Sequence, residues 1–168
     1  NGLNLLQRKQ SMEASKRIAL VAHDNRKKDL IEWVAWNWSI LINHQLVCTG
    51  TTGRLVEEAM IRNSGPGNAE RIRVKKLKSG PLGGDQQLGA LIAEGEIDGI
   101  IFLWDPMEPH PHDVDVKALL RICVLYNIPT ACNRSTADFM ISSPLFNQKY
   151  QPKVADYQDY TSRGIDIS

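Results

Sequence analysis

The sequence predicts a three-layer α/β/α sandwich around a mainly parallel, five-stranded sheet. Five short segments have the length and the apolar content of strands, and helical patterns alternate with them. Connections of about a dozen or more residues between successive strands indicate parallel β/α units, with helices on both faces of the sheet. The carboxyl ends of such strands meet at one edge, which is where open α/β sheets bind ligands.

The strands are expected where apolar residues run continuously or alternate with charged residues. The segment 71–78 alternates basic and apolar residues, which indicates an edge strand with a solvated basic face, although that face can also attract an anionic substrate. The predicted strands cover residues 17–22, 45–49, 71–78, 98–104 and 128–133.

Helices are expected after each strand. The segment 27–43 carries apolar residues on more than one helical stripe, so it should be largely buried, with its three tryptophans in the core or at a subunit contact. Asp115 and Ser135 are expected to cap the last two helices. The predicted helices cover residues 27–43, 54–62, 87–94, 116–127 and 135–143.

The length of 168 residues favours one domain with a substantial core. We expect a polar lead-in at 1–16, a single α/β catalytic domain at 17–144, and a C-terminal tail at 145–168 that is ordered against a neighbouring subunit. The formal net charge of +1, from 20 basic and 19 acidic residues, argues against a nucleic-acid or membrane-surface partner. No segment has the roughly 20 apolar residues that span a bilayer.

Cysteine usage and the first residues of the chain bear on the cellular compartment. Cys48, Cys123 and Cys132 lie in apolar segments without CxxC spacing, which indicates buried thiols and no disulfide. The first 16 residues hold no apolar run of signal-peptide length. These observations predict a cytoplasmic protein.

The densest chemical signal is the glycine-rich stretch SGPLGGDQQ at 79–87. Its three glycines allow a sharp turn and a close backbone approach, and the following helix directs its N–H groups into the loop. Ser79 and Gly80 suit a phosphate, whereas the Asp85 carboxylate repels one. We interpret Asp85 as a base held near a phosphorylated substrate. The alternative is a strand-to-helix turn in which Asp85 satisfies N–H groups.

A second candidate cradle is TGTTG at 49–53, which follows the second strand. It lacks the P-loop pattern and the full GxGxxG pattern. The hydroxyl and N–H groups of Thr49, Gly50, Thr51 and Thr52 can hold one phosphate without magnesium or a nucleotide. A helix-capping turn is the alternative.

Two further polar residues follow the first strand. His23 ends this strand at the ligand-binding edge, and Lys27 lies one helical turn further along the chain. A surface loop histidine is the alternative for His23.

The loop after the fourth strand contains a dense group of acids and histidines. Histidines with carboxylates suit zinc or iron, but prolines splay the two histidines and no HxxxH or HExxH pattern presents them on one helix. An acid/base pair of one histidine and one aspartate requires fewer side chains to converge than a metal site does. The group consists of Asp105, Glu108, His110, His112, Asp113 and Asp115.

Taken in order, these motifs resemble those of the methylglyoxal synthase family. The matching blocks are LVAHD at 20–24, TGTTG at 49–53, SGPLGGDQQ at 79–87, WDP at 104–106 and HDVDVKALLR at 112–121. The resemblance implies a Rossmann-like or flavodoxin-like cytoplasmic lyase, usually a homohexamer, that needs no cofactor or metal. It implies conversion of dihydroxyacetone phosphate into methylglyoxal and inorganic phosphate, a product that can also inhibit.

The resemblance also implies roles for individual residues. It makes Asp85 the catalytic base and His112 the active-site histidine, with Asp105 and Asp115 as supporting acids. Its substrate-binding positions are His23, Lys27, Thr49, Gly50, Thr51, Thr52, Ser79, Gly80 and His112, with Arg163 as the best match for a phosphate-binding arginine from a neighbouring subunit.

Two departures from the family pattern stand out. The segment between Gly53 and Ser79 is longer than in familiar members, which predicts a longer surface loop. The spacing from Tyr157 to Arg163 differs by one residue from the family pattern.

Two other classes of protein stay open at this stage. A binding module that resembles the allosteric domain of carbamoyl phosphate synthetase needs the two cradles but no acid/base set. A response-regulator receiver needs an acidic pair after its first strand, where only Asp24 fits.

Overall fold

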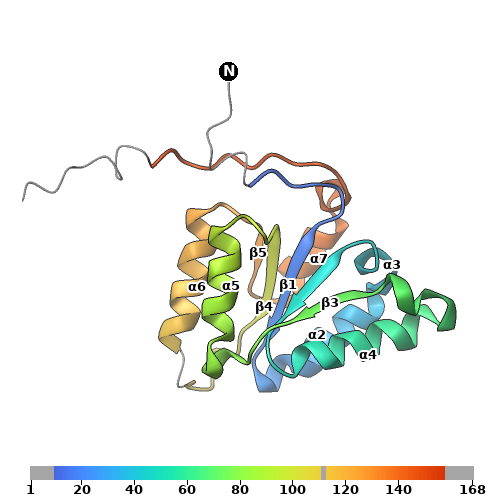
Figure 1. Cartoon of the computed structure of the whole chain (residues 1–168). Coiled ribbons are helices and arrows are strands. Elements are labelled where there is room, and N and C mark those ends of the chain that lie inside the picture. The colour runs from blue at the N-terminus through green and yellow to red at the C-terminus, as the bar shows by residue number, and fades with distance from the viewer. Residues whose placement is uncertain (1–9, 111–112, 158–168) are drawn as a thin grey trace, which may run out of the picture.

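The five predicted strands form one parallel sheet in the computed structural model, which describes residues 10–110 and 113–157. Their order is β3-β2-β1-β4-β5, so the basic strand β3 is an edge strand, as predicted (Figure 1). Strand β1 has the predicted bounds, and the other four strands are shorter than the predicted segments. They are β1 (Arg17–Ala22), β2 (Gln45–Cys48), β3 (Arg73–Lys76), β4 (Gly99–Leu103) and β5 (Thr130–Ala131).

Helices cover both faces of the sheet, which confirms the three-layer architecture (Figure 1). One face carries α2 (Lys27–Trp36), α3 (Trp38–Leu41), α4 (Thr52–Ser64) and α7 (Arg134–Ser142). The other face carries α5 (Gly84–Ala93) and α6 (Asp113–Leu125). Short 3-10 helices occupy Asp24–Arg26, Pro66–Arg71, Gly80–Leu82 and Pro144–Asn147.

The central strand β1 divides the core into two apolar clusters. Ile18 and Leu20 belong to the cluster beneath α2 and α4, whereas Ala19 and Val21 belong to the cluster beneath α5 and α6. Successive side chains of a strand point to opposite faces, so a strand covered on both sides must be apolar at every position. This explains the continuous apolar run at 18–22 in β1.

The predicted helix at 27–43 is interrupted at Asn37. The Asn37 side-chain amide and its main-chain N–H both donate to the Trp33 carbonyl oxygen, at 2.9 and 3.0 Å, and this closes α2. Trp33 is buried and donates its indole N–H to Asp138, whereas Trp36 is 86% exposed. The prediction of one continuous helix is therefore wrong at Asn37. Trp36, the last residue of α2, does not join the core of this chain, and its place at a subunit contact stays a prediction.

Both predicted helix caps are wrong. Helix α6 begins at Asp113, so Asp115 lies inside its first turn. Helix α7 begins one residue before Ser135, and its cap is Asn133, whose side chain accepts the Thr136 N–H at 2.9 Å. Asparagine and serine are similarly good caps, so residue type alone does not favour Ser135 over Asn133.

The three cysteines are free thiols. Cys48 and Cys123 are buried as predicted, and burial raises their pKa values to about 12 and about 11. Cys132 is exposed, so its predicted burial is wrong: it follows the short edge strand β5, where the chain leaves the core.

The described ends of the chain pack on the sheet domain itself. Met12 and Tyr150 form an antiparallel bridge with hydrogen bonds of 2.9 and 3.0 Å, and Phe146 and Val154 are buried. The division of the chain at residues 16 and 144 stays a prediction.

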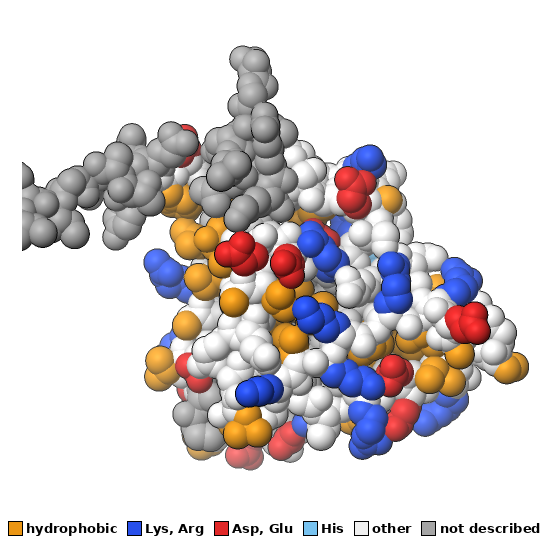
Figure 2. All heavy atoms as spheres, viewed as in Figure 1, with side chains coloured by type: hydrophobic (Ala, Val, Ile, Leu, Met, Phe, Trp, Pro, Cys, Tyr) orange, Lys and Arg blue, Asp and Glu red, His pale blue; other side chains and the backbone are white. Residues whose placement is uncertain are grey.

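The surface carries both signs of charge. Figure 2 shows lysine and arginine side chains interspersed with acidic ones over one face of the molecule. Within the described residues, no helix combines the length and the apolar character needed to cross a bilayer.

Candidate active site

A cavity of about 470 Å³ lies where the carboxyl ends of β1, β2 and β4 meet the loop that follows β3. It brings together Asp85 and all the predicted substrate-binding residues of the described chain. Its lining residues are Val21, Ala22, His23, Asp24, Lys27, Thr49, Gly50, Thr51, Thr52, Ser79, Gly80, Pro81, Asp85, Phe102 and His110. His112 and Arg163 lie outside the described residues.

The threonine cradle and the glycine-rich loop touch one another at Gly50. This glycine has a φ of +57°, and its N–H donates to the Lys78 carbonyl oxygen at 3.1 Å. A Cβ at this position would lie 3.3 Å from both Cα and Cβ of Ser79. Glycine therefore permits both the left-handed turn and the close approach of the two loops.

The threonines do not form the capping turn that was the alternative interpretation. Thr51 is the residue before α4, and its side chain makes no capping hydrogen bond. Its hydroxyl instead accepts a hydrogen bond from the Lys27 ammonium at 3.1 Å. The first N–H groups of α4, which begins at Thr52, are thus left for a ligand in the cavity.

Lys27 supplies a positive charge beside this helix start. Its ammonium also pairs with Asp24 at 2.7 Å. The hydrogen bond and the charge of Lys27 lower the pKa of the Asp24 carboxyl group. The Asp24 contact keeps the ammonium at the cavity, and the Thr51 contact joins the segment after β1 to the loop after β2.

The glycine-rich loop aims Asp85 into the cavity. Gly83 has a φ of +101°, and the Gly84 N–H donates to the Ser79 carbonyl oxygen at 2.8 Å. A Cβ on Gly84 would lie 2.0 Å from the Lys78 carbonyl oxygen, so no other residue fits here without moving the backbone. Asp85 is the second residue of α5 and is only 3% exposed. The positive end of the α5 dipole favours its ionised form.

Two stacked histidines form another wall. The His23 ring lies 3.7 Å from the His110 ring, measured between centroids, and meets Phe102 edge-on at 5.2 Å. His23 Nδ1 accepts the Asp105 main-chain N–H at 3.2 Å, which places the ring proton of a neutral His23 on Nε2. The sequence places His110 in the group weighed as a metal site or an acid/base pair, and its contact with His23 is a tertiary contact that no sequence spacing reveals.

Asp105 supports this wall and is not among the lining residues. Its carboxylate accepts hydrogen bonds from the Asn25 side chain at 2.9 Å and from the Met107 N–H at 3.0 Å. Both hydrogen bonds lower the pKa of Asp105, and the bond from Asn25 has the larger effect. The carboxylate therefore stays ionised and fixes the loops that carry His23 and His110.

Asp115 lies on the other side of Asp85. Both aspartates line a smaller cavity of about 220 Å³ between α5 and α6. Asp85 thus borders two cavities, and Asp115 borders only the smaller one. No three histidine, cysteine, aspartate or glutamate side chains cluster as metal ligands in residues 10–110 and 113–157.

Comparisons with known proteins place this fold and site among the MGS-like domains, whose family model matches residues 30–132. The methylglyoxal synthase of Maridesulfovibrio salexigens is 58% identical over 92% of this chain and 100% of that protein. The methylglyoxal synthase of Leptospira interrogans is 56% identical over 88% of this chain and 93% of that protein. The chain belongs to the methylglyoxal synthase family.

A solved structure has the same fold. The crystal structure of methylglyoxal synthase from Elizabethkingia anophelis NUHP1 superposes with a TM-score of 0.82 and 49% sequence identity. The match covers 94% of this chain and 97% of that one.

Proposed function

We propose that this chain is a carbon–oxygen lyase that converts dihydroxyacetone phosphate into methylglyoxal and inorganic phosphate. One observation supports the proposal beyond the family membership: a buried carboxylate, Asp85, lines the same cavity as the two loops predicted to bind a phosphate. A simple anion-binding site gains nothing from a buried carboxylate. A site that removes a proton from a phosphorylated substrate requires one.

The phosphate group would bind at the threonine cradle that follows β2, next to Lys27 from the segment after β1. The N–H groups at the start of α4, the Thr51 hydroxyl and the Lys27 ammonium are all available at this point of the cavity. Ser79 and Gly80 close the cradle from the neighbouring loop. This anchors the end of the substrate opposite to its hydroxymethyl group.

Asp85 would take a proton from the hydroxymethyl carbon next to the ketone, which gives an enediolate. A well-placed general base accelerates a reaction by about 10²–10⁴-fold. The Nε2 proton of His23 is held by the Asp105 contact and can stabilise an enediolate oxygen. The family resemblance gives His112 the role of moving a proton between the enediolate oxygens.

Elimination then breaks the bond between the third carbon and the phosphate oxygen. The electron pair of the enediolate forms a carbon–carbon double bond as phosphate leaves, and the resulting enol takes a proton on its methylene carbon to give methylglyoxal. The breaking bond must stand out of the enediolate plane for this step. An isomerase that shares the intermediate keeps this bond near the plane.

The test is to incubate the pure protein with dihydroxyacetone phosphate and to measure methylglyoxal, inorganic phosphate and glyceraldehyde 3-phosphate. We expect the first two in equal amounts and none of the third. Glyceraldehyde 3-phosphate as the main product would identify an isomerase, and the absence of any product would favour a phosphate-binding module.

We also propose a cytoplasmic homohexamer in which Arg163 of one subunit reaches the phosphate of another. Large exposed apolar side chains support subunit contacts, among them Trp36 at 86% and Phe139 at 79%. The free cysteine thiols support a reducing compartment. Sedimentation of the native protein tests the assembly.

A further inference from the structure

A second cavity, of about 200 Å³, lies at the opposite end of the sheet from the candidate active site. It reaches Ile18 near the start of β1, whereas the active-site cavity reaches Val21 near the end of the same strand, about 10 Å away at the rise of an extended chain. The two cavities share no lining residue. The second is lined by Met12, Lys16, Ile18, Asp98, Gly99, Pro129, Met140, Ser143, Leu145, Phe146 and Tyr150.

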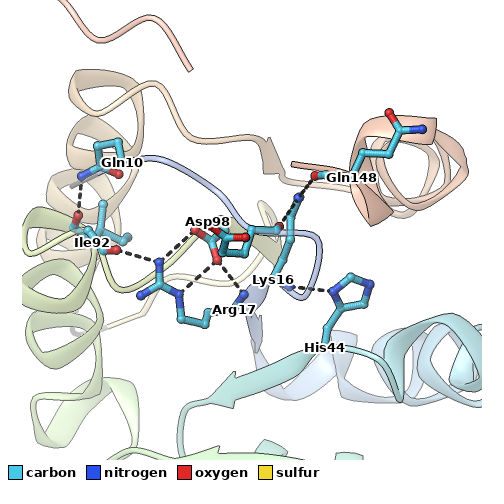
Figure 3. A network of polar contacts seen from close by, with 9 residues as sticks. Gln10, Lys16, Arg17, His44, Ile92, Asp98 and Gln148 are labelled. Carbon is cyan, nitrogen blue, oxygen red and sulfur yellow. Dashed lines mark hydrogen bonds and ion pairs between the residues drawn. The ribbon is translucent and has the colours of Figure 1, made fainter. Parts of the chain in front are cut away.

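The aspartate in this lining is fully neutralised. Asp98 accepts two hydrogen bonds from the Arg17 guanidinium, at 3.0 and 3.1 Å, and one from the Arg17 main-chain N–H at 2.8 Å (Figure 3). Arg17 also donates to the Gly95 carbonyl oxygen at 2.7 Å. The Asp98 carboxylate is thus already paired, and Arg17 itself does not line this cavity.

Lys16, in contrast, is a buried cation without a carboxylate partner among the described residues. The residue is 5% exposed, and its ammonium donates to the main-chain oxygens of Glu13 at 2.7 Å and Gln148 at 2.5 Å (Figure 3). These two acceptors lie in the two chain segments that border the cavity. An ammonium has three donors, so one donor stays available.

The burial of this cation has an energetic cost. Burial lowers the pKa of Lys16, and the more distant charges of Asp98 and Glu13 oppose the effect only in part. A charge removed from water is stabilised by a directly bound counter-ion. A ligand that brings an anionic group to Lys16 would therefore gain binding energy that no group of the described chain provides.

We propose that this cavity binds a small monocarboxylate whose carboxylate pairs with Lys16 and whose short apolar chain fills the space between Ile18, Met140 and Phe146. An apolar cavity of about 150 Å³ holds benzene, so the observed volume suits a chain of about six carbon atoms. A single ammonium next to the Asp98 carboxylate favours a monoanion over a phosphate dianion. The ligand would join the sheet, α7 and the C-terminal tail.

The methionines of the chain provide a direct test, because two of the four line this cavity, namely Met12 and Met140. The protein is labelled with ¹³C at the methionine methyl groups and titrated with hexanoate, 1-hexanol and hexylamine. Hexanoate is expected to shift the Met12 and Met140 signals and to leave the Met60 signal unchanged. The neutral alcohol should bind at least tenfold more weakly, and the amine should not bind.

Two lysine variants isolate the charge. Lys16→Met should weaken hexanoate binding at least tenfold and leave the affinity for hexanol unchanged or higher. Lys149→Met is the matched control, because this lysine follows Gln148, whose carbonyl oxygen Lys16 binds, but its own side chain is 78% exposed. It should bind hexanoate as the unmodified protein does.

Three results would overturn the proposal: equal affinities for hexanoate and hexanol, signal shifts at Met60 alone, or no binding of hexanoate at millimolar concentration. The first two comparisons use the unmodified protein, so they decide the question even if Lys16→Met does not fold. The measurement requires no enzymatic turnover and is independent of the function proposed above.

Discussion

The substitution Asp85→Asn separates proton abstraction from phosphate binding, the two roles proposed for the active-site cavity. It keeps the shape of a side chain that is 3% exposed and removes its charge. As a result, proton abstraction should fail while phosphate binding improves. We expect kcat to fall by about 10²–10⁴-fold, which is the usual contribution of a general base.

The gain in phosphate affinity follows from the size of the cavity. A sphere with the observed volume of about 470 Å³ is about 10 Å across, so we take about 10 Å as the separation of the carboxylate and the bound phosphate. Two unit charges at that distance repel by about 0.4 kcal/mol in water and by about 1.7 kcal/mol at an effective dielectric constant of about 20. Removal of the Asp85 charge should thus tighten phosphate binding by about 2- to 16-fold.

The assay combines the initial rate of methylglyoxal formation with calorimetric titration of inorganic phosphate. Asp29→Asn serves as the control, because Asp29 lies on α2, does not line the cavity and has a side chain that is 42% exposed. Its rate and its phosphate affinity should not change. A near-normal rate for Asp85→Asn, or weaker phosphate binding by that variant, would refute the assignment of Asp85 as a base beside the phosphate.

Three further predictions concern the loop, the histidine stack and the buried histidine at the start of β2. Gly84→Ala should lower the free energy of unfolding by about 1–3 kcal/mol, because the new Cβ meets a carbonyl oxygen. Gly89→Ala in the same helix meets no atom and should raise the free energy of unfolding by up to about 1 kcal/mol. Urea unfolding of both variants checks the difference. His110→Ala should raise KM by releasing the His23 ring, and His110→Phe should restore it by keeping the stack, so equal kinetics of the two variants would exclude a positioning role. Burial lowers the pKa of His44, so this histidine is protonated at a lower pH in the folded protein than in the unfolded chain. The free energy of unfolding should therefore fall as the pH drops below 6.5. A His44→Gln variant should lose this part of the pH dependence of urea unfolding.

The sheet and its ligand-binding edge were predictable because their signals are local. A strand covered on both faces must be apolar throughout, and β1 and β4 show this directly in the sequence. Gly83 and Gly84 meet steric needs that arise within their own loop, whereas Gly50 also allows the close approach of Ser79 from another loop. Parallel pairing then brings the loops after the strands to one edge without further information.

The remaining features depend on contacts between distant segments. The end of α2 at Asn37 and the cap of α7 at Asn133 each depend on one side-chain hydrogen bond. Other polar side chains nearby in the sequence can make the same kind of bond. The stack of His23 and His110 joins residues from two loops, and only the pairing of β1 with β4 brings those loops together. Sequence spacing therefore pointed to the residues but not to their partners.

The longer segment predicted between Gly53 and Ser79 can be accommodated before β3, where the exposed 3-10 helix Pro66–Arg71 leads into the edge strand. The end of β3 is held separately, because the Leu77 N–H donates to the Cys48 carbonyl oxygen at 2.8 Å and the Gly50 N–H donates to the Lys78 carbonyl oxygen. Residues added before β3 can therefore lengthen the surface segment without moving the loop that carries Asp85.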